Sequence, residues 1–179
     1  DHCVVGEPSS TEVLGDMIKI GRRGSLNAVI TSEGRQGHVA YPQRALNPLP
    51  PLIALLARLQ AHPLDDGYPQ FQASNLEVTT VDVGNAASNV IPATARAQLN
   101  IRFNPSHTGA GLADWLAAEA RKAGEGFAGT ITVTPQISGE AFLTEPGPFV
   151  EVVAGAVRGV SGVEPELSTT GGTSDARFI

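Results

Sequence analysis

The stretch ATARAQLNIRFN, residues 93–104, alternates apolar and polar side chains with a period of two. In a β-strand this period directs successive side chains to opposite faces. One face then carries five apolar residues, namely Ala95, Ala97, Leu99, Ile101 and Phe103, and Arg102 lies on the other face. A strand with one apolar and one polar face is typical of an antiparallel sheet that is covered on one side only.

The segments around this strand predict a small α+β domain. Strands are expected over residues 16–32, 74–84 and 129–138, and helices over 45–62 and 111–123. Gly21 and Gly24 indicate irregularities in the first strand, and Pro50 and Pro51 fit the first turn of the first helix. The order strand, helix, strand, strand, helix, strand is that of the ferredoxin-like βαββαβ unit, with one antiparallel sheet and both helices on the same face.

The segments outside this unit predict a second domain. We expect a short buried strand over residues 3–7, a helix over 146–160 and another strand over 164–170. These elements are interpreted as pieces of a larger α/β domain, into which the small domain is inserted. The predicted boundaries are residues 1–14 and 140–179 for the larger domain and 15–139 for the inserted one. Because the chain begins within an apolar strand and stops on an apolar pair, we expect a fragment.

The composition restricts the class of protein. The chain has 179 residues, a net charge of −6 and 41% hydrophobic residues, as expected of one or two globular domains. The acidic balance argues against nucleic acid or an anionic membrane as partner. A single cysteine, Cys3, excludes an internal disulfide and fits a reducing cytoplasm. No apolar run approaches the roughly 20 residues of a membrane span. We therefore expect a soluble, cytoplasmic protein.

Three polar residues are candidates for chemistry, and each also has an ordinary structural explanation. Glu7 follows an apolar segment, where it could be a metal ligand or general base, or cap a turn. His38 follows Gly37 on a loop, where it could reach a ligand or remain an exposed loop histidine. Asn89 could donate its amide to a developing oxyanion, although asparagine is also common in turns.

Basic and glycine-rich segments indicate binding of an anion. Lys19, Arg22 and Arg23 lie together near the irregular part of the first strand, where they could bind an anionic substrate or keep an edge strand soluble. Arg102 could recognise a carboxylate or lie on a solvated sheet face. The stretch STTGGTSDARF, residues 168–178, could direct backbone N–H groups at an anion. A nucleotide phosphate is not expected, since the Walker pattern is absent.

Taken together, five segments resemble the succinyl-diaminopimelate desuccinylase family, a branch of the M20 metallopeptidases. They are CVVGEPSS (3–10), IKIGRRGSLN (18–27), GRQGHVAYP (34–42), NVIPATARAQLNIRF (89–103) and TTGGTSDARF (169–178). The resemblance covers essentially the whole chain. It implies a ferredoxin-like lid domain inserted in an α/β zinc-peptidase-like catalytic domain, of which the chain holds only parts.

The resemblance also implies roles for individual residues. Glu7 would be a zinc ligand, and His38 would reach across a homodimer and stabilise the tetrahedral intermediate in the partner's active site. Asn89 would also contact substrate across the dimer. The positions expected to bind the substrate carboxylates or to line the succinyl side of the pocket are Lys19, Arg22, Tyr41, Arg102, Gly171, Gly172 and Thr173.

The implied reaction is the hydrolysis of N-succinyl-LL-2,6-diaminopimelate to succinate and LL-2,6-diaminopimelate, a step of lysine and diaminopimelate biosynthesis. The resemblance implies two zinc ions in each active site, with cobalt as a possible substitute. The other metal ligands of the family fall outside this chain, so the fragment alone is expected to bind no catalytic zinc and to be inactive. The alternatives are a related M20 deacylase or aminoacylase, and a stand-alone ferredoxin-like module that dimerises or binds a small ligand.

Overall fold

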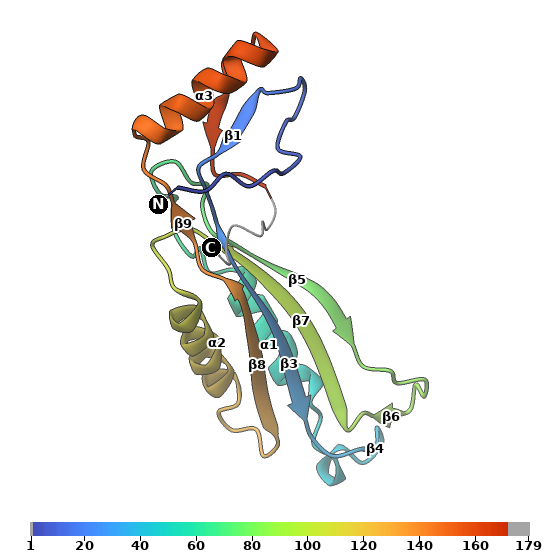
Figure 1. Ribbon diagram of the computed structural model, residues 1–179. Helices are drawn as coiled ribbons and strands as arrows, with labels where there is room; N and C mark the ends of the chain where they lie inside the picture. The colour runs from blue at the N-terminus through green and yellow to red at the C-terminus, as the bar shows by residue number, and fades with distance from the viewer. Residues whose placement is uncertain (1, 172–179) are drawn as a thin grey trace.

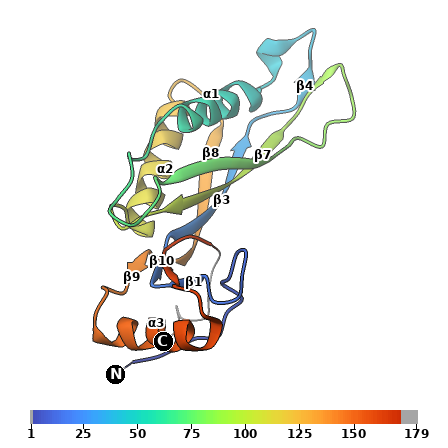
Figure 2. The ribbon, with the colours of Figure 1, turned by 90° about the horizontal axis from the view of Figure 1, so that it is seen from above.

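The computed structural model describes residues 2–171. Its largest unit is a four-stranded antiparallel sheet (Figure 1), in which the strand order is β5, β7, β3, β8. The bounds of these strands are Asn75–Asp82 for β5, Thr94–Phe103 for β7, Gly24–Glu33 for β3 and Thr130–Gly139 for β8. Helices α1 (Leu49–Gln60) and α2 (Gly109–Ala123) cover one face of the sheet, as Figure 2 shows. The predicted ferredoxin-like α+β fold is thus confirmed.

The alternation of the central strand decides which face is buried. The five apolar residues of β7 that share a face in the sequence, from Ala95 to Phe103, are each at most 2% exposed. They pack against leucines of α1 and α2, including Leu52, Leu55 and Leu116, which are 0% exposed. The opposite face of the sheet carries polar side chains. Because one face of the sheet meets water and the other meets the helices, apolar and polar residues alternate along β7.

The helix boundaries follow from local chemistry. Helix α1 begins at Leu49, because Pro50 and Pro51 lack the N–H that the first turn leaves unbonded, and the Asn47 side chain accepts the Leu49 N–H at 3.1 Å. Helix α2 begins two residues before the predicted start. There the Thr108 hydroxyl caps the helix by accepting the Gly111 N–H at 3.1 Å.

A second, smaller group of elements lies at one end of the sheet. Strand β1 (Met17–Lys19) runs parallel to β10 (Glu166–Ser168), and β2 (Gly21–Arg22) pairs with β9 (Phe142–Leu143). Helix α3 (Pro148–Ser161) lies beside them (Figure 1). The expected irregularities near Gly21 and Gly24 are confirmed, since the predicted strand 16–32 consists of β1, β2 and β3.

The predicted strand over residues 3–7 is wrong. Residues 2–10 adopt no regular secondary structure, and Ser9 donates its N–H to Glu7 O at 2.8 Å in a local turn. An apolar run becomes a strand only when its backbone groups find a neighbouring ladder. Within residues 2–171, β1 pairs with β10 alone, so residues 3–7 form no ladder with either strand.

The opposite end of the sheet carries a small projecting tip. Here β4 (Gly37–His38) pairs with β6 (Val90–Ile91), and a short 3-10 helix, η1 (Pro42–Arg44), follows β4. Figure 1 shows the tip beyond the ends of β3 and β7, far from α3. Within residues 2–171, no helix is both long and apolar enough to cross a membrane.

Candidate functional site

The candidate residues form two groups at opposite ends of the sheet. The distal cluster, on the tip, consists of His38, Tyr41 and Asn89. The proximal cluster, near β1 and β10, consists of Lys19, Arg22, Arg102 and Gly171. Strand β3 runs from one end to the other with 10 residues, a length of about 33 Å at 3.3 Å per residue. The two clusters therefore cannot contact the same small molecule within one copy of the chain.

Pairing between β4 and β6 builds the distal cluster. His38 lies opposite Val90, and the Val39 N–H donates to Asn89 O at 3.1 Å. This places His38 Nε2 3.5 Å from Asn89 Nδ2. Among the described contacts neither ring nitrogen meets a carboxylate, so His38 has no acidic partner of the kind that supports a general base. The geometry favours a hydrogen-bond donor.

The tip is held by contacts that its sequence only partly indicates. The Arg44 guanidinium lies 5.2 Å from the centre of the Tyr41 ring, and Arg35 Nε donates to Arg44 O at 3.0 Å. A Cβ added to Gly37 would lie 2.7 Å from Ala45 Cβ. Gly37 lies in β4, and the absence of a side chain there allows the close approach of two backbone segments.

Parallel pairing between β1 and β10 brings Lys19 beside the glycine-rich loop. Lys19 Nζ donates to Thr170 Oγ1 at 2.9 Å, across 151 positions of sequence. It would lie 3.6 Å from a Cβ placed on Gly171. Burial lowers the pKa of Lys19, and the charge of Glu166 opposes this shift. The predicted residues Gly172 and Thr173 lie outside the described residues.

The two arginines of the proximal cluster lie on strands of different sheets. Arg22, on β2, is only 4% exposed. Arg102, on β7, is paired with Ser25 on one side and Asn75 on the other. Arg23 Nη1 donates to Asn75 Oδ1 at 3.0 Å, and its pKa is lowered by burial and then by the positive charge of Arg102. The charge of Arg102 thus repels that of Arg23, and an anion bound beside them would offset this repulsion.

Glu7 remains a predicted metal ligand. It is exposed, and within residues 2–171 no group of three or more His, Cys, Asp or Glu side chains is placed to hold a metal ion. A carboxylate is a suitable zinc ligand, but a catalytic zinc needs about three protein ligands. Glu7 could thus contribute one ligand to a centre whose remaining ligands are not among the described residues.

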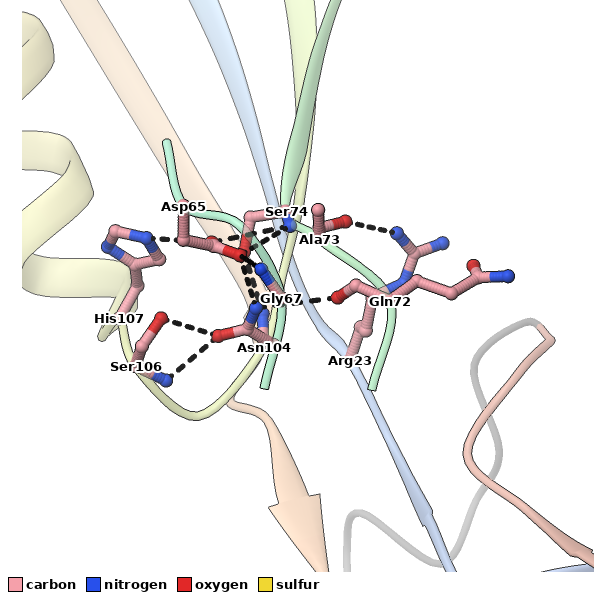
Figure 3. A network of polar contacts seen from close by, with 9 residues as sticks. All are labelled: Arg23, Asp65, Gly67, Gln72, Ala73, Ser74, Asn104, Ser106 and His107. Carbon is pink, nitrogen blue, oxygen red and sulfur yellow. Dashed lines mark hydrogen bonds and ion pairs between the residues drawn. The ribbon is translucent and has the colours of Figure 1, made fainter. Parts of the chain in front are cut away.

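Figure 3 shows a polar network around Asp65 that no motif in the sequence indicates. Asp65 Oδ1 accepts hydrogen bonds from Asn104 Nδ2 at 2.7 Å and from the Gly67 N–H at 2.8 Å, and Oδ2 lies 3.0 Å from His107 Nε2. Burial opposes ionisation of this carboxyl, but the hydrogen bonds it accepts outweigh burial and lower its pKa to about 2. The network ties the loop before β5 to the end of β7. No local motif indicates it, because Asp65 and His107 are 42 residues apart.

We expect Asp65→Asn to destabilise the protein by about 2 kcal/mol at neutral pH, because several charge-assisted hydrogen bonds are weakened. The folded pKa of Asp65 is below its usual value of 3.8. Its contribution is therefore complete above about pH 4 and is lost as the pH falls toward about 2. Urea unfolding at several pH values tests this. The difference between wild type and variant should shrink in acid, and a difference that stays constant with pH contradicts the assignment. Asp66→Asn, at an exposed neighbour, is the matched control.

A family model described as peptidase dimerisation domain, M20_dimer, matches residues 20–127. The chain belongs to this M20 peptidase dimerisation family. It resembles succinyl-diaminopimelate desuccinylases of Phenylobacterium zucineum, with 72% identity over 179 residues, and of Caulobacter vibrioides, with 65% identity. All of the chain is matched, against 47% and 46% of these relatives, so it spans about half their length.

Solved structures support the fold. The aminopeptidase PepT of Bacillus cereus matches 94% of the chain with a TM-score of 0.74 and 16% identity, and the chain covers 43% of it. An M20 metallo-carboxypeptidase of Sulfolobus solfataricus matches 90% of the chain with a TM-score of 0.70 and 15% identity, and the chain covers 55% of it. The resemblance seen in the five sequence segments is confirmed by the desuccinylase relatives.

Proposed function

We propose that the chain is the lid, with adjoining parts of the catalytic domain, of a succinyl-diaminopimelate desuccinylase. The observation that carries this proposal is the 72% identity to such a protein across all 179 residues. The reaction would be the hydrolysis of N-succinyl-LL-2,6-diaminopimelate to succinate and LL-2,6-diaminopimelate, in the cytoplasm. The domain boundaries would be 1–14, 15–139 and 140–179.

The proposed site residues have three different roles. Lys19, Arg22 and Arg102 would neutralise carboxylates of the substrate, together with Tyr41 and the loop that begins at Gly171. His38 and Asn89 would donate hydrogen bonds to the oxygen of the amide under attack, where negative charge develops. Glu7 would help to hold zinc, or cobalt in its place, and the bound metal supplies water activation and polarisation of the carbonyl. The isolated fragment is expected to be inactive.

A second copy of the chain would allow both clusters to contact the same substrate molecule. Since about 33 Å separates the two ends of β3, the distal cluster must act on substrate held by another subunit. A two-fold axis supplies this if it places the tip of one lid at the proximal end of the other. The exposed side chains of the tip, with Tyr41 52% and Val39 47% exposed, are suited to burial in such a contact.

Strand β8 is the edge of the sheet best suited to this contact. Its residues Thr130–Gly139 carry no charge, and its own register shift lies at Ser138, outside Thr130–Thr134, whereas the other edge strand, β5, carries Glu77 and Asp82 and has a bulge in its middle. Charges and bulges protect an edge against pairing. Two copies of β8 related by a two-fold axis would pair antiparallel over Thr130–Thr134, ahead of Pro135, and bring each tip toward the partner's proximal cluster.

Thr134→Lys is expected to weaken the dimer of the full-length protein about tenfold, because residue 134 of one copy would face Thr130 of the other, and the substitution places a charge in an otherwise uncharged strand pair. Thr80→Lys is the matched control. Thr80 lies on the opposite edge strand, β5. Cross-strand pairs connect it to Thr134 through Gln98 and Val29, so both threonines lie at the same level of the sheet. Sedimentation velocity over a dilution series measures both dissociation constants. A dimer weakened by Thr80→Lys and not by Thr134→Lys would assign the interface to β5.

The substrate is tested on the full-length protein. Purified enzyme with zinc should hydrolyse N-succinyl-LL-2,6-diaminopimelate with a kcat/KM far above that for the N-acetyl analogue. The reverse preference would favour a related M20 deacylase or aminoacylase. Hydrolysis of neither compound, with an intact dimer, would favour a module that only dimerises or binds a ligand.

A further inference from the structure

The two nitrogen atoms of the His38 ring have different partners. Nδ1 accepts a hydrogen bond from the backbone N–H of Ala40 at 3.1 Å. Nε2 faces Asn89 Nδ2 at 3.5 Å. A neutral imidazole carries its proton on one nitrogen only, and the nitrogen that accepts a hydrogen bond is the one without it. The proton of a neutral His38 ring is therefore on Nε2.

We propose that the backbone amide of Ala40 is a positioning group that fixes the tautomer of His38, with the Nε2 proton directed away from its own backbone and toward the substrate of the partner. The proposal rests on the proposed function, in which His38 donates to the developing oxyanion. In the other tautomer Nε2 would present a lone pair, which repels an oxyanion.

The fold of the tip explains why Ala40 supplies this donor. The neighbouring backbone N–H groups are already used, since Val39 donates to Asn89 O at 3.1 Å and Tyr41 donates to His38 O at 2.9 Å. Only the amide between them is turned toward the ring. The turn that closes between His38 and Tyr41 therefore holds the ring from the Nδ1 side, and the β4–β6 pairing places Asn89 on the Nε2 side.

With Nδ1 occupied, the Nε2 proton needs an acceptor. His38 Nε2 and Asn89 Nδ2 are then two donors 3.5 Å apart. They cannot bond one another, but a single oxygen can accept from both at ordinary distances of about 2.9 Å. Without the Ala40 amide, His38 Nε2 could accept a hydrogen bond from Asn89. With it, His38 and Asn89 both donate, and together they can bind one oxygen atom.

Nuclear magnetic resonance tests the hydrogen bond directly. In deuterated full-length protein labelled with ¹⁵N at histidine and alanine, we expect a coupling across the hydrogen bond between the Ala40 amide nitrogen and His38 Nδ1. The two-bond ¹⁵N–¹H pattern should place the ring proton on Nε2. His38→Gln identifies the ring signals. A proton on Nδ1, or an Ala40 amide without this coupling, overturns the proposal, whatever the activity of the enzyme.

Kinetics provides the second readout. Ala40→Pro removes the N–H and is expected to lower kcat about tenfold with little change in KM, since substrate binding by the proximal cluster is untouched. Ala40→Gly keeps the N–H and is the matched control, with activity close to wild type. Equal losses in the two variants would show that the side chain or the turn matters rather than the amide, and would overturn the proposal. The coupling in the unsubstituted protein decides the case if Ala40→Pro does not fold.

Discussion

His38→Ala is expected to lower kcat of the full-length protein by about two orders of magnitude or more, the usual cost of losing one donor to an oxyanion. The reason is the geometry of the distal cluster. His38 lies on an exposed tip, it has no acidic partner among the described contacts, and its Nε2 is adjacent to a second donor on Asn89. KM should change little, because the cationic side chains that we propose bind carboxylates lie at the other end of the sheet.

Two further measurements distinguish a catalytic role from a structural one. His62→Ala, at an exposed histidine whose ring is tilted by 30° against Trp115 with ring centres 5.3 Å apart, should leave kcat close to wild type. Mixing His38→Ala subunits with Arg102→Ala subunits should restore activity, because a mixed dimer contains one complete site. At free exchange the recovered activity is about a quarter of wild type. Mixed dimers without activity would mean that both residues serve the same subunit's site.

Gly24→Ala is expected to lower the free energy of unfolding by about 2–3 kcal/mol. A Cβ on Gly24 would lie 2.2 Å from Cζ of Phe103, its cross-strand partner, and the Phe103 side chain is 0% exposed. The ring lies over the glycine and belongs to the buried core cluster, so it cannot move without displacing other core side chains. Thermal unfolding should show a melting temperature about 5–10 °C lower.

The matched control is Gly155→Ala, within helix α3, where an added Cβ meets nothing within 4 Å. This change should be neutral or stabilise the protein by about 0.5–1 kcal/mol, because alanine favours helix more than glycine does. The double variant Gly24→Ala/Phe103→Leu should be more stable than the sum of the single effects predicts. Strict additivity would show that the ring and the new methyl group do not collide.

Much of the fold could be predicted because its pattern is local. The period of two over residues 94–103 fixed which side of β7 meets the helices, and the prolines and the Thr108 cap set the helix starts within a few residues. The strand predicted over residues 3–7 failed for a physical reason. Apolar, β-branched residues favour an extended chain, but only a neighbouring strand converts it into a sheet.

The candidate site was predictable in its residue types and not in its arrangement. His38, Asn89 and Arg102 were indicated by their motifs, but their sequence positions do not reveal that the first two share a tip and the third lies at the far end of the sheet. The Asp65 network was not predicted at all. Its members come from the loop before β5 and from the end of β7, and each alone has the composition of an ordinary turn.

The sequence by itself determined the order of the elements in the four-stranded unit, the buried face of the sheet and the family, since these depend on periodicity and on motifs of a few adjacent residues. Only the tertiary structure decided that the chemically important residues form two clusters about 33 Å apart, that Ala40 holds the His38 ring, and that Gly24 gives room to Phe103. The reason is that these relations depend on strand register and chain closure. They join residues far apart in sequence, and no local pattern of side chains encodes them.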